Sequence, residues 1–164
     1  MSVVVCDAPA GMEAEIRRAA RRAMQAGGYH SGRLEIAIVG DAEMRRQHQR
    51  WLGRATVTDV LSFDLRDRAE PGRVEGQLIV CETVARRQAK LHDADWRGEL
   101  LLYVVHGCLH LCGHDDRRAV HAAEMHARED QLLSLLGWGP VFSAPAAGQV
   151  GRRRQASSRS RGRV

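Results

Sequence analysis

The spacing of apolar residues changes along the chain between two patterns, one typical of β-strands and one typical of helices. Short apolar runs that alternate with polar positions predict β-strands, whereas apolar residues three and four positions apart predict amphipathic helices. Strands are expected at 2–6, 34–40, 58–64 and 74–81. Helices are expected at 13–26, 42–53, 82–92, 95–113 and 117–137. The order β-α-β-α-β-β-α-α-α predicts an α+β fold in which one small mixed four-stranded sheet is covered by about five helices.

Polar and glycine residues mark the ends of two of these helices. Asp41 is expected to be the N-cap of the helix at 42–53, because a carboxylate can accept the free backbone N–H groups of a first helical turn. Gly113 is expected to end the helix at 95–113 and to let the chain turn back.

Length and charge limit the domain organisation. The chain of 164 residues suits one domain, expected at residues 1–143 and followed by a disordered arginine-rich tail at 144–164. The net charge is +5, but the last fourteen residues hold six arginines and no acid, which leaves −1 for residues 1–150. A tail of Gly, Ser and Arg cannot bury a core. It is either a solvated tail or a contact for phosphates.

The location of the protein is predicted from its apolar runs and its cysteines. No run approaches the roughly 20 apolar residues of a membrane span, and the N-terminus lacks the basic start and apolar stretch of a signal peptide. The protein is therefore expected to be cytoplasmic, with no membrane partner. The four scattered cysteines favour reduced thiols that mostly pack, with no disulfide-linked partner. They are Cys6, Cys81, Cys108 and Cys112.

The segment HGCLHLCGHDD at 106–116 follows the most apolar run of the chain, LLLYVV at 100–105. On a helix, His106 and His110 share one face and lie close enough to bind one ion. Two histidines that are simply hydrogen-bonded in a core are the alternative, but the following glycine turn and acid cluster favour a metal. Three protein ligands with an open position are typical of a catalytic metal site. The candidates for the third ligand are His114, Asp115 and Asp116.

The residue after the first histidine separates two kinds of metal enzyme. Zinc proteases of the H-E-x-x-H type carry their general-base glutamate there. This chain has Gly107 at that position, which argues against a conventional metalloprotease.

The pattern H-G-x-L-H-L-x-G-H-D, from His106 to Asp115, closely resembles the signature of the YbeY family of metal-dependent endoribonucleases. TDVLSF at 58–63 resembles a second family hallmark, and AEMHARED at 123–130 resembles the family's glutamate-and-methionine helix. The resemblance covers roughly residues 30–137.

The resemblance implies a mixed four-stranded sheet, a zincin-like metal helix and hydrolysis of single-stranded RNA. It also implies a role with the small ribosomal subunit, in maturation of the 3′ end of 16S rRNA and in ribosome quality control. The family register selects His106, His110 and Asp116 as ligands, with aspartate where most members carry a third histidine. One zinc ion is expected, although a carboxylate ligand would also admit other divalent ions.

Other positions depart from the family pattern or have two interpretations. The family usually has arginine where this chain has Leu52, and Arg54 either contacts a phosphate in its place or is an ordinary solvated side chain. Glu124 either accepts a hydrogen bond from a ligating imidazole or lies on the solvated helix surface. His121 and His126 are expected at the surface or behind the ligands rather than among them.

Two other functions are compatible with the same residues. One is a metal-dependent hydrolase of another substrate, for example a peptide. The other is a ribosome assembly factor without catalytic activity, in which the metal ties the last helices together.

Overall fold

The computed structural model describes residues 1–66, 70–114, 116, 118–141 and 162–163. Its strands are β1 (Ser2–Cys6), β2 (Ser31–Val39), β3 (Val60–Asp64), β4 (Arg73–Cys81) and β5 (Gly162–Arg163). Its helices are α1 (Glu13–Ala26), α2 (Asp41–Leu52), α3 (Glu82–Leu91), α4 (Trp96–Leu111) and α5 (Ala119–Leu135). The expected strands and helices all form in the expected order, which confirms the α+β prediction.

The strands make one mixed sheet in the order β1-β2-β4-β3-β5. β1, β2 and β4 are parallel, and β3 runs antiparallel to β4. β2 begins earlier than expected because its first residue, Ser31, already pairs with Arg73 of β4. The two-residue strand β5 adds to the four expected strands by pairing with Leu61 and Ser62 of β3.

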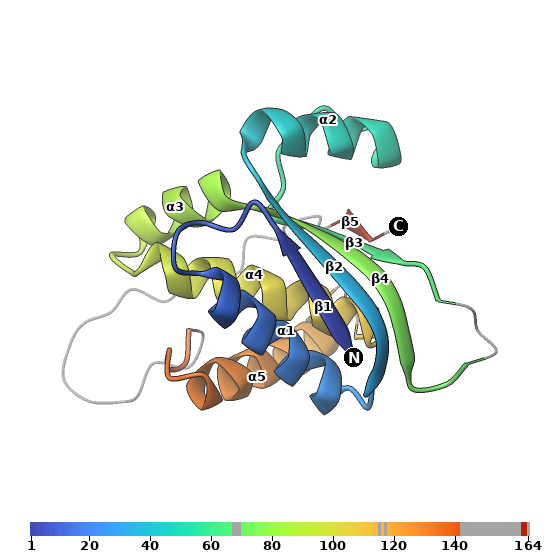
Figure 1. Cartoon of the computed structure of the whole chain (residues 1–164). Helices are drawn as coiled ribbons and strands as arrows, with labels where there is room; N and C mark the ends of the chain where they lie inside the picture. The colour runs from blue at the N-terminus through green and yellow to red at the C-terminus, as the bar shows by residue number, and fades with distance from the viewer. Residues whose placement is uncertain (67–69, 115, 117, 142–161, 164) are drawn as a thin grey trace.

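Helix α4 lies at the centre of the molecule. Figure 1 shows α1, α4 and α5 beneath one face of the sheet and α2 on the opposite side. α1, α3, α5 and the sheet all pack against α4, so its residues from Glu99 to Leu111 are buried. A helix enclosed on every side needs no polar face, which explains the apolar run at 100–105.

Gly107 sets how closely α4 approaches the sheet. A β-carbon at this position would lie 2.9 Å from Leu78 of β4 and 3.0 Å from Val60 of β3. The backbone carbonyl of Gly107 also accepts a hydrogen bond from Ser62 Oγ at 3.4 Å. The absence of a side chain therefore lets α4 lie directly on the TDVLSF strand.

The prediction that Asp41 caps α2 was wrong. The N-cap is Gly40, and no side chain caps the helix. The carboxylate of Asp41 instead accepts a hydrogen bond from Arg87 of α3 at 2.5 Å and one from the Cys81 thiol at 3.6 Å. The bond from Arg87 lowers the pKa of Asp41. Asp41 therefore joins α2 to α3 rather than closing its own helix.

The predicted tail at 144–164 lies outside the described residues except for β5. None of the described helices is long and apolar enough to cross a membrane. All four cysteines are free thiols. Cys81 and Cys108 are buried, Cys112 is half-buried and Cys6 is exposed, which agrees with the expectation that most of them pack.

Candidate metal centre

Two histidines of α4 and one aspartate after it converge at the end of the helix. The Nε2 atoms of His106 and His110 lie 2.8 Å apart, with the rings at 85° to each other. One carboxylate oxygen of Asp116 lies 3.9 Å from His106 Nε2, and the other lies 3.9 Å from His110 Nε2. The possible ligand atoms of the three residues all lie within 4.8 Å of one another. The structure thus brings the three sequence-predicted ligands together.

The second nitrogen of each ring is held by a hydrogen bond. His110 Nδ1 donates to the backbone carbonyl of His114 at 2.9 Å, and a carbonyl can only accept. His106 Nδ1 donates to the carboxylate of Glu129 on α5. Each ring therefore carries a proton on Nδ1, which leaves Nε2 as the atom that faces the other two residues of the cluster.

This arrangement fits a bound cation. Two unprotonated Nε2 atoms 2.8 Å apart would repel each other unless a proton or a metal ion lay between them. Ligands about 2.0–2.2 Å from one tetrahedral ion would lie roughly 3.3 Å from each other. The observed separations of 2.8 and 3.9 Å lie on either side of that value. Two imidazoles and a carboxylate suit zinc and also other divalent first-row metals.

The turn after α4 brings Asp116 to the histidines. Gly113 has φ +92°, a backbone conformation that glycine adopts at little cost. The Gly113 N–H bonds the His110 carbonyl at 2.9 Å, and the His114 N–H bonds the Leu109 carbonyl at 3.0 Å. These two bonds form a Schellman motif, which ends the helix and reverses the chain. The expected role of Gly113 is confirmed.

The other two candidates for the third ligand differ in their positions. His114 supplies its backbone carbonyl to His110, and its side chain is outside the cluster formed by the described residues. Burial, followed by the nearby Arg128 guanidinium, lowers the pKa of the His114 imidazole. Asp115 lies outside the described residues.

Glu129 is the residue that the sequence reasoning missed. Its side chain is fully buried, whereas Glu124, the predicted partner of a ligating imidazole, is exposed and makes no such bond. The sequence does hold a signal, because an acid at a position in the apolar stripe of a helix needs a buried partner. The buried positions of α5 are Met125, Glu129, Asp130, Leu132 and Leu133. His121 and His126, also on α5, are half-buried and outside the cluster of described residues.

Leu52, which stands where the family usually has arginine, and Arg54, two residues further on, differ in burial. Leu52, at the end of α2, is half-buried and packs against the hydrophobic core. Arg54 is exposed on the loop between α2 and β3. His48 of α2 anchors this loop, because its Nδ1 lies 2.8 Å from the Thr56 carbonyl. The loop is therefore fixed to α2 close to Arg54.

The fold and the converging side chains define a small α+β protein built around a buried cluster of two histidines and one carboxylate. The sequence model of the family Endoribonuclease YbeY matches residues 7–137. This chain belongs to that family of RNA-cleaving enzymes.

Individual relatives agree with the family assignment. An Endoribonuclease YbeY of Acidothermus cellulolyticus is 35% identical over 133 residues, covering 74% of this chain and 78% of the relative. One of Myxococcus xanthus is 38% identical over 107 residues, which span 63% of this chain but only 36% of that longer protein. The solution structure of a Thermotoga maritima protein, 17% identical, superposes with a TM-score of 0.58 over 90% of this chain and 100% of that one. The structural likeness supports the fold.

Proposed function

We propose that this chain is a metal-dependent endoribonuclease that cleaves single-stranded RNA. The family assignment supports cleavage of RNA. The observation that carries metal dependence is the pair of Nε2 atoms 2.8 Å apart, on rings whose Nδ1 atoms are both held by acceptors. That geometry is costly for two neutral imidazoles alone and favourable around a cation.

His106, His110 and Asp116 would hold one divalent ion, for which zinc is the proposed identity. A divalent ion bound there supplies acidity to a water molecule and positive charge to a phosphodiester. The carboxylate of Glu129 fixes the ring orientation of His106 and makes that imidazole a stronger ligand. The His114 carbonyl orients His110 in the same way.

The exposure of the three side chains indicates the direction from which substrate approaches. The side chains of His106 and His110 are 1% and 7% exposed, whereas that of Asp116 is 21% exposed. The helix and sheet close the histidine side, so RNA and water reach the centre past Asp116. Arg54 is proposed as a phosphate contact, because a cation near the cleaved bond would stabilise developing negative charge.

The resemblance to the family supports a specific cellular role. We propose that the substrate is ribosomal RNA of the small subunit, with action in 16S rRNA 3′-end maturation and ribosome quality control in the cytoplasm.

Two rival functions remain testable. A peptide hydrolase of the H-E-x-x-H type is disfavoured, because Gly107 stands where such an enzyme carries its general-base glutamate. A ribosome assembly factor without catalytic activity would use the ion to join α4, the following turn and α5.

One assay distinguishes these functions. The purified protein, with and without chelator, is offered single-stranded RNA, structured RNA and casein. We expect cleavage of single-stranded RNA that chelator abolishes and zinc restores, and that Asp116→Ala removes. Casein cleavage would favour the peptide hydrolase. No turnover together with a large metal-dependent rise in melting temperature would favour the assembly factor.

A further inference from the structure

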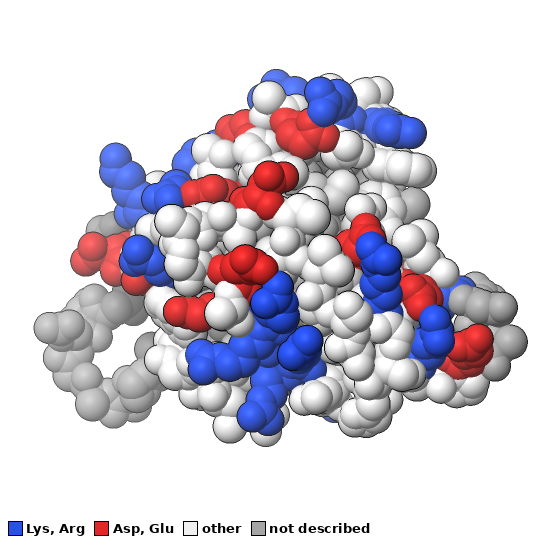
Figure 2. Space-filling model, in the orientation of Figure 1, with Lys and Arg blue, Asp and Glu red and all other residues white. Residues whose placement is uncertain are grey.

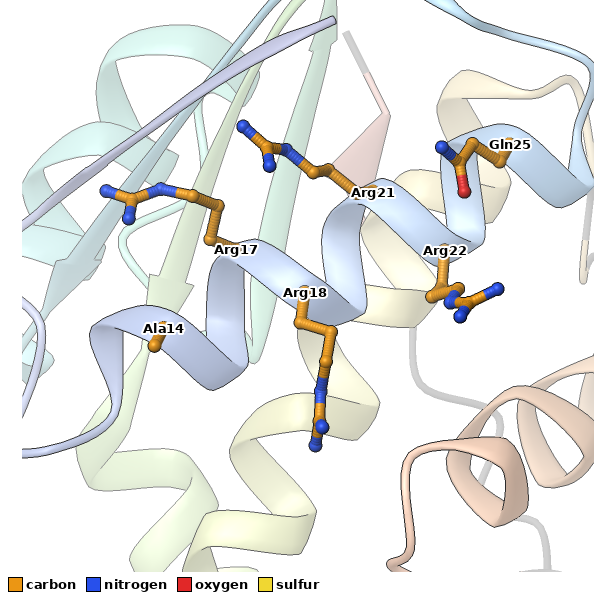
Figure 3. Close-up of a pocket in the computed structure, with 6 residues that line it drawn as sticks. All are labelled: Ala14, Arg17, Arg18, Arg21, Arg22 and Gln25. Carbon is orange, nitrogen blue, oxygen red and sulfur yellow. The ribbon is translucent and has the colours of Figure 1, made fainter.

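The solvent face of α1 carries four arginines within six residues. Figure 3 shows the shallow depression that they form, with Arg17 and Arg21 leaning to one side of the helix and Arg18 to the other. Its lining residues are Ala14, Arg17, Arg18, Arg21, Arg22 and Gln25. The opposite side of the helix is apolar and buried, through Ile16, Ala19, Ala20, Ala23 and Met24. Figure 2 shows this basic patch over α1 as a contiguous group.

The patch concentrates positive charge on a part of the chain that is otherwise nearly neutral. Residues 1–150 have a net charge of −1, so acids elsewhere balance these arginines. Arg17 and Arg21, and likewise Arg18 and Arg22, are like-charged pairs four residues apart, an arrangement that destabilises a helix. The last turn of α1, where cations would favour the helix dipole, holds no basic residue. Apart from Arg17, which pairs with Glu13, the arginines are therefore not placed to stabilise their own helix.

Two of the four arginines are occupied and two are available. Arg17 pairs with Glu13 at 2.5 Å, and Arg18 donates to the Leu136 carbonyl at 3.2 Å. Arg21 and Arg22 are exposed and make no hydrogen bond or ion pair with the part of the chain that the structure describes. Their guanidinium groups can bind an external anion without breaking a contact within the protein.

We propose that the basic patch on α1 binds the phosphate backbone of RNA, at a surface separate from the metal centre. Neither a large apolar nor an aromatic side chain lines the patch, whereas protein interfaces usually centre on such residues. Arg17 and Arg22 are five residues apart, which is about 7.5 Å along a helix axis. A stacked strand presents a phosphate about every 3.4 Å, so the patch spans two or three of them. Guanidinium groups bind phosphates well, by paired hydrogen bonds.

The direction of α1 connects the patch to the metal centre. Met24, near the end of α1, contacts Cys112 at the end of α4, with the two sulfur atoms 3.9 Å apart. Cys112 follows His110 by only two residues. An RNA strand that lies along α1 can therefore extend toward the end of α4 that carries the histidines. This inference rests on the proposed function only in taking RNA as the bound nucleic acid.

The test measures binding without cleavage. A 30-nucleotide fluorescent single-stranded RNA is titrated with the full-length protein in chelator over a range of KCl concentrations. Arg21→Gln with Arg22→Gln removes two charges and keeps good helix formers. The control is Arg45→Gln with Arg46→Gln, two adjacent exposed arginines on α2, of which Arg46 pairs with Glu43. We expect the α1 variant to lower the log–log salt slope by about 1.4, or 0.7 per phosphate, and the control to retain the wild-type slope.

The results of this titration decide whether RNA binds to the basic patch on α1. A wild-type salt slope in the α1 variant would overturn the proposal, as would an equal loss in the α2 control. If the α1 variant keeps the wild-type salt slope for RNA but no longer binds poly-glutamate, the patch binds an acidic protein rather than RNA. Cleavage of a dinucleotide, whose single phosphodiester cannot lie at the metal centre and on α1 at once, is expected to be the same in both variants. If no RNA is cleaved at all, the proposed function fails, and the binding slopes still decide the role of α1.

Discussion

Glu129 of α5 accepts a hydrogen bond from Nδ1 of His106 of α4, and both side chains are almost completely buried. This bond turns the His106 ring so that its Nε2 faces His110 and Asp116. It also joins the last helix to the candidate metal centre. Metal binding and packing of α5 should therefore depend on each other.

Glu129→Gln should weaken metal binding by about 10- to 100-fold, since a ligating imidazole loses basicity when its carboxylate partner becomes neutral. Competition with a chromophoric zinc chelator measures the affinity. Glu124→Gln is the matched control on the exposed side of α5 and should bind as wild type. Equal affinities for the two variants would show that Glu129 does not tune the centre.

The identity of the third ligand can be read from metal content after dialysis. Asp116→Ala should lose metal at least as severely as His110→Ala. His114→Ala should lose little, because the contact with His110 is made by its backbone carbonyl. Asp116→His should keep a site with stronger zinc preference, because imidazole is the softer ligand. If Asp116→Ala keeps a full equivalent of zinc while the position-114 or position-115 alanine variant loses it, the assignment is wrong.

The missing cation beside the TDVLSF strand gives a prediction for RNA cleavage. Leu52→Arg should raise the cleavage rate, and Arg54→Ala should lower it if Arg54 contacts the phosphate. Leu52 packs against the core, so Leu52→Gln serves as a control that loses the same packing without gaining charge. Changes below about twofold in both variants, under ~0.4 kcal/mol of barrier, would mean that the phosphate is held elsewhere.

Removal of residues 151–164, which includes the two-residue strand β5, should leave the protein folded and weaken RNA binding. The salt slope should fall by about 0.7 for each single-strand phosphate that the tail neutralises. A full-length variant with all six tail arginines changed to serine separates charge from length and should behave like the truncation. A wild-type slope in both would show that the tail takes no part in binding.

The thiols should differ sharply in reactivity. Burial raises the pKa of Cys112 to about 11 and that of Cys108 well above its ordinary value, so neither forms much thiolate at pH 8. Ellman's reagent should react rapidly with Cys6 alone in the folded protein, and Cys6→Ser should remove that phase. A second rapid thiol in the wild type would contradict the burial of the others.

The same shift predicts a change of stability with pH. The pKa of the Cys112 thiol is higher in the folded than in the unfolded state. Its contribution to the free energy of unfolding is therefore fully present below the ordinary pKa of 9.0. That contribution is lost as pH rises toward about 11. Cys112→Ala should therefore make the fall in unfolding free energy over this range shallower, as urea titrations at each pH would measure.

The sequence by itself determined the features that depend on residues close together in the chain. The i, i+4 spacing of His106 and His110 places them on one face of any helix, and Gly113 favours the turn that follows. The alternating strand patterns and the helical periodicities predicted the order of elements for the same reason, because a regular backbone repeats locally. The family register added Asp116, which spacing alone could not separate from His114 or Asp115.

The tertiary structure decided which distant groups meet. Glu129 rather than Glu124 reaches His106, because the packing of α5 on α4 turns that side of the helix inward. Asp41 bonds Arg87, 46 residues away, instead of capping its helix. Such partners depend on how whole elements pack against one another, which the short-range pattern of a single sequence does not specify. The physical reason is that the burial of a charged group selects its partner by position in space, not by spacing along the chain.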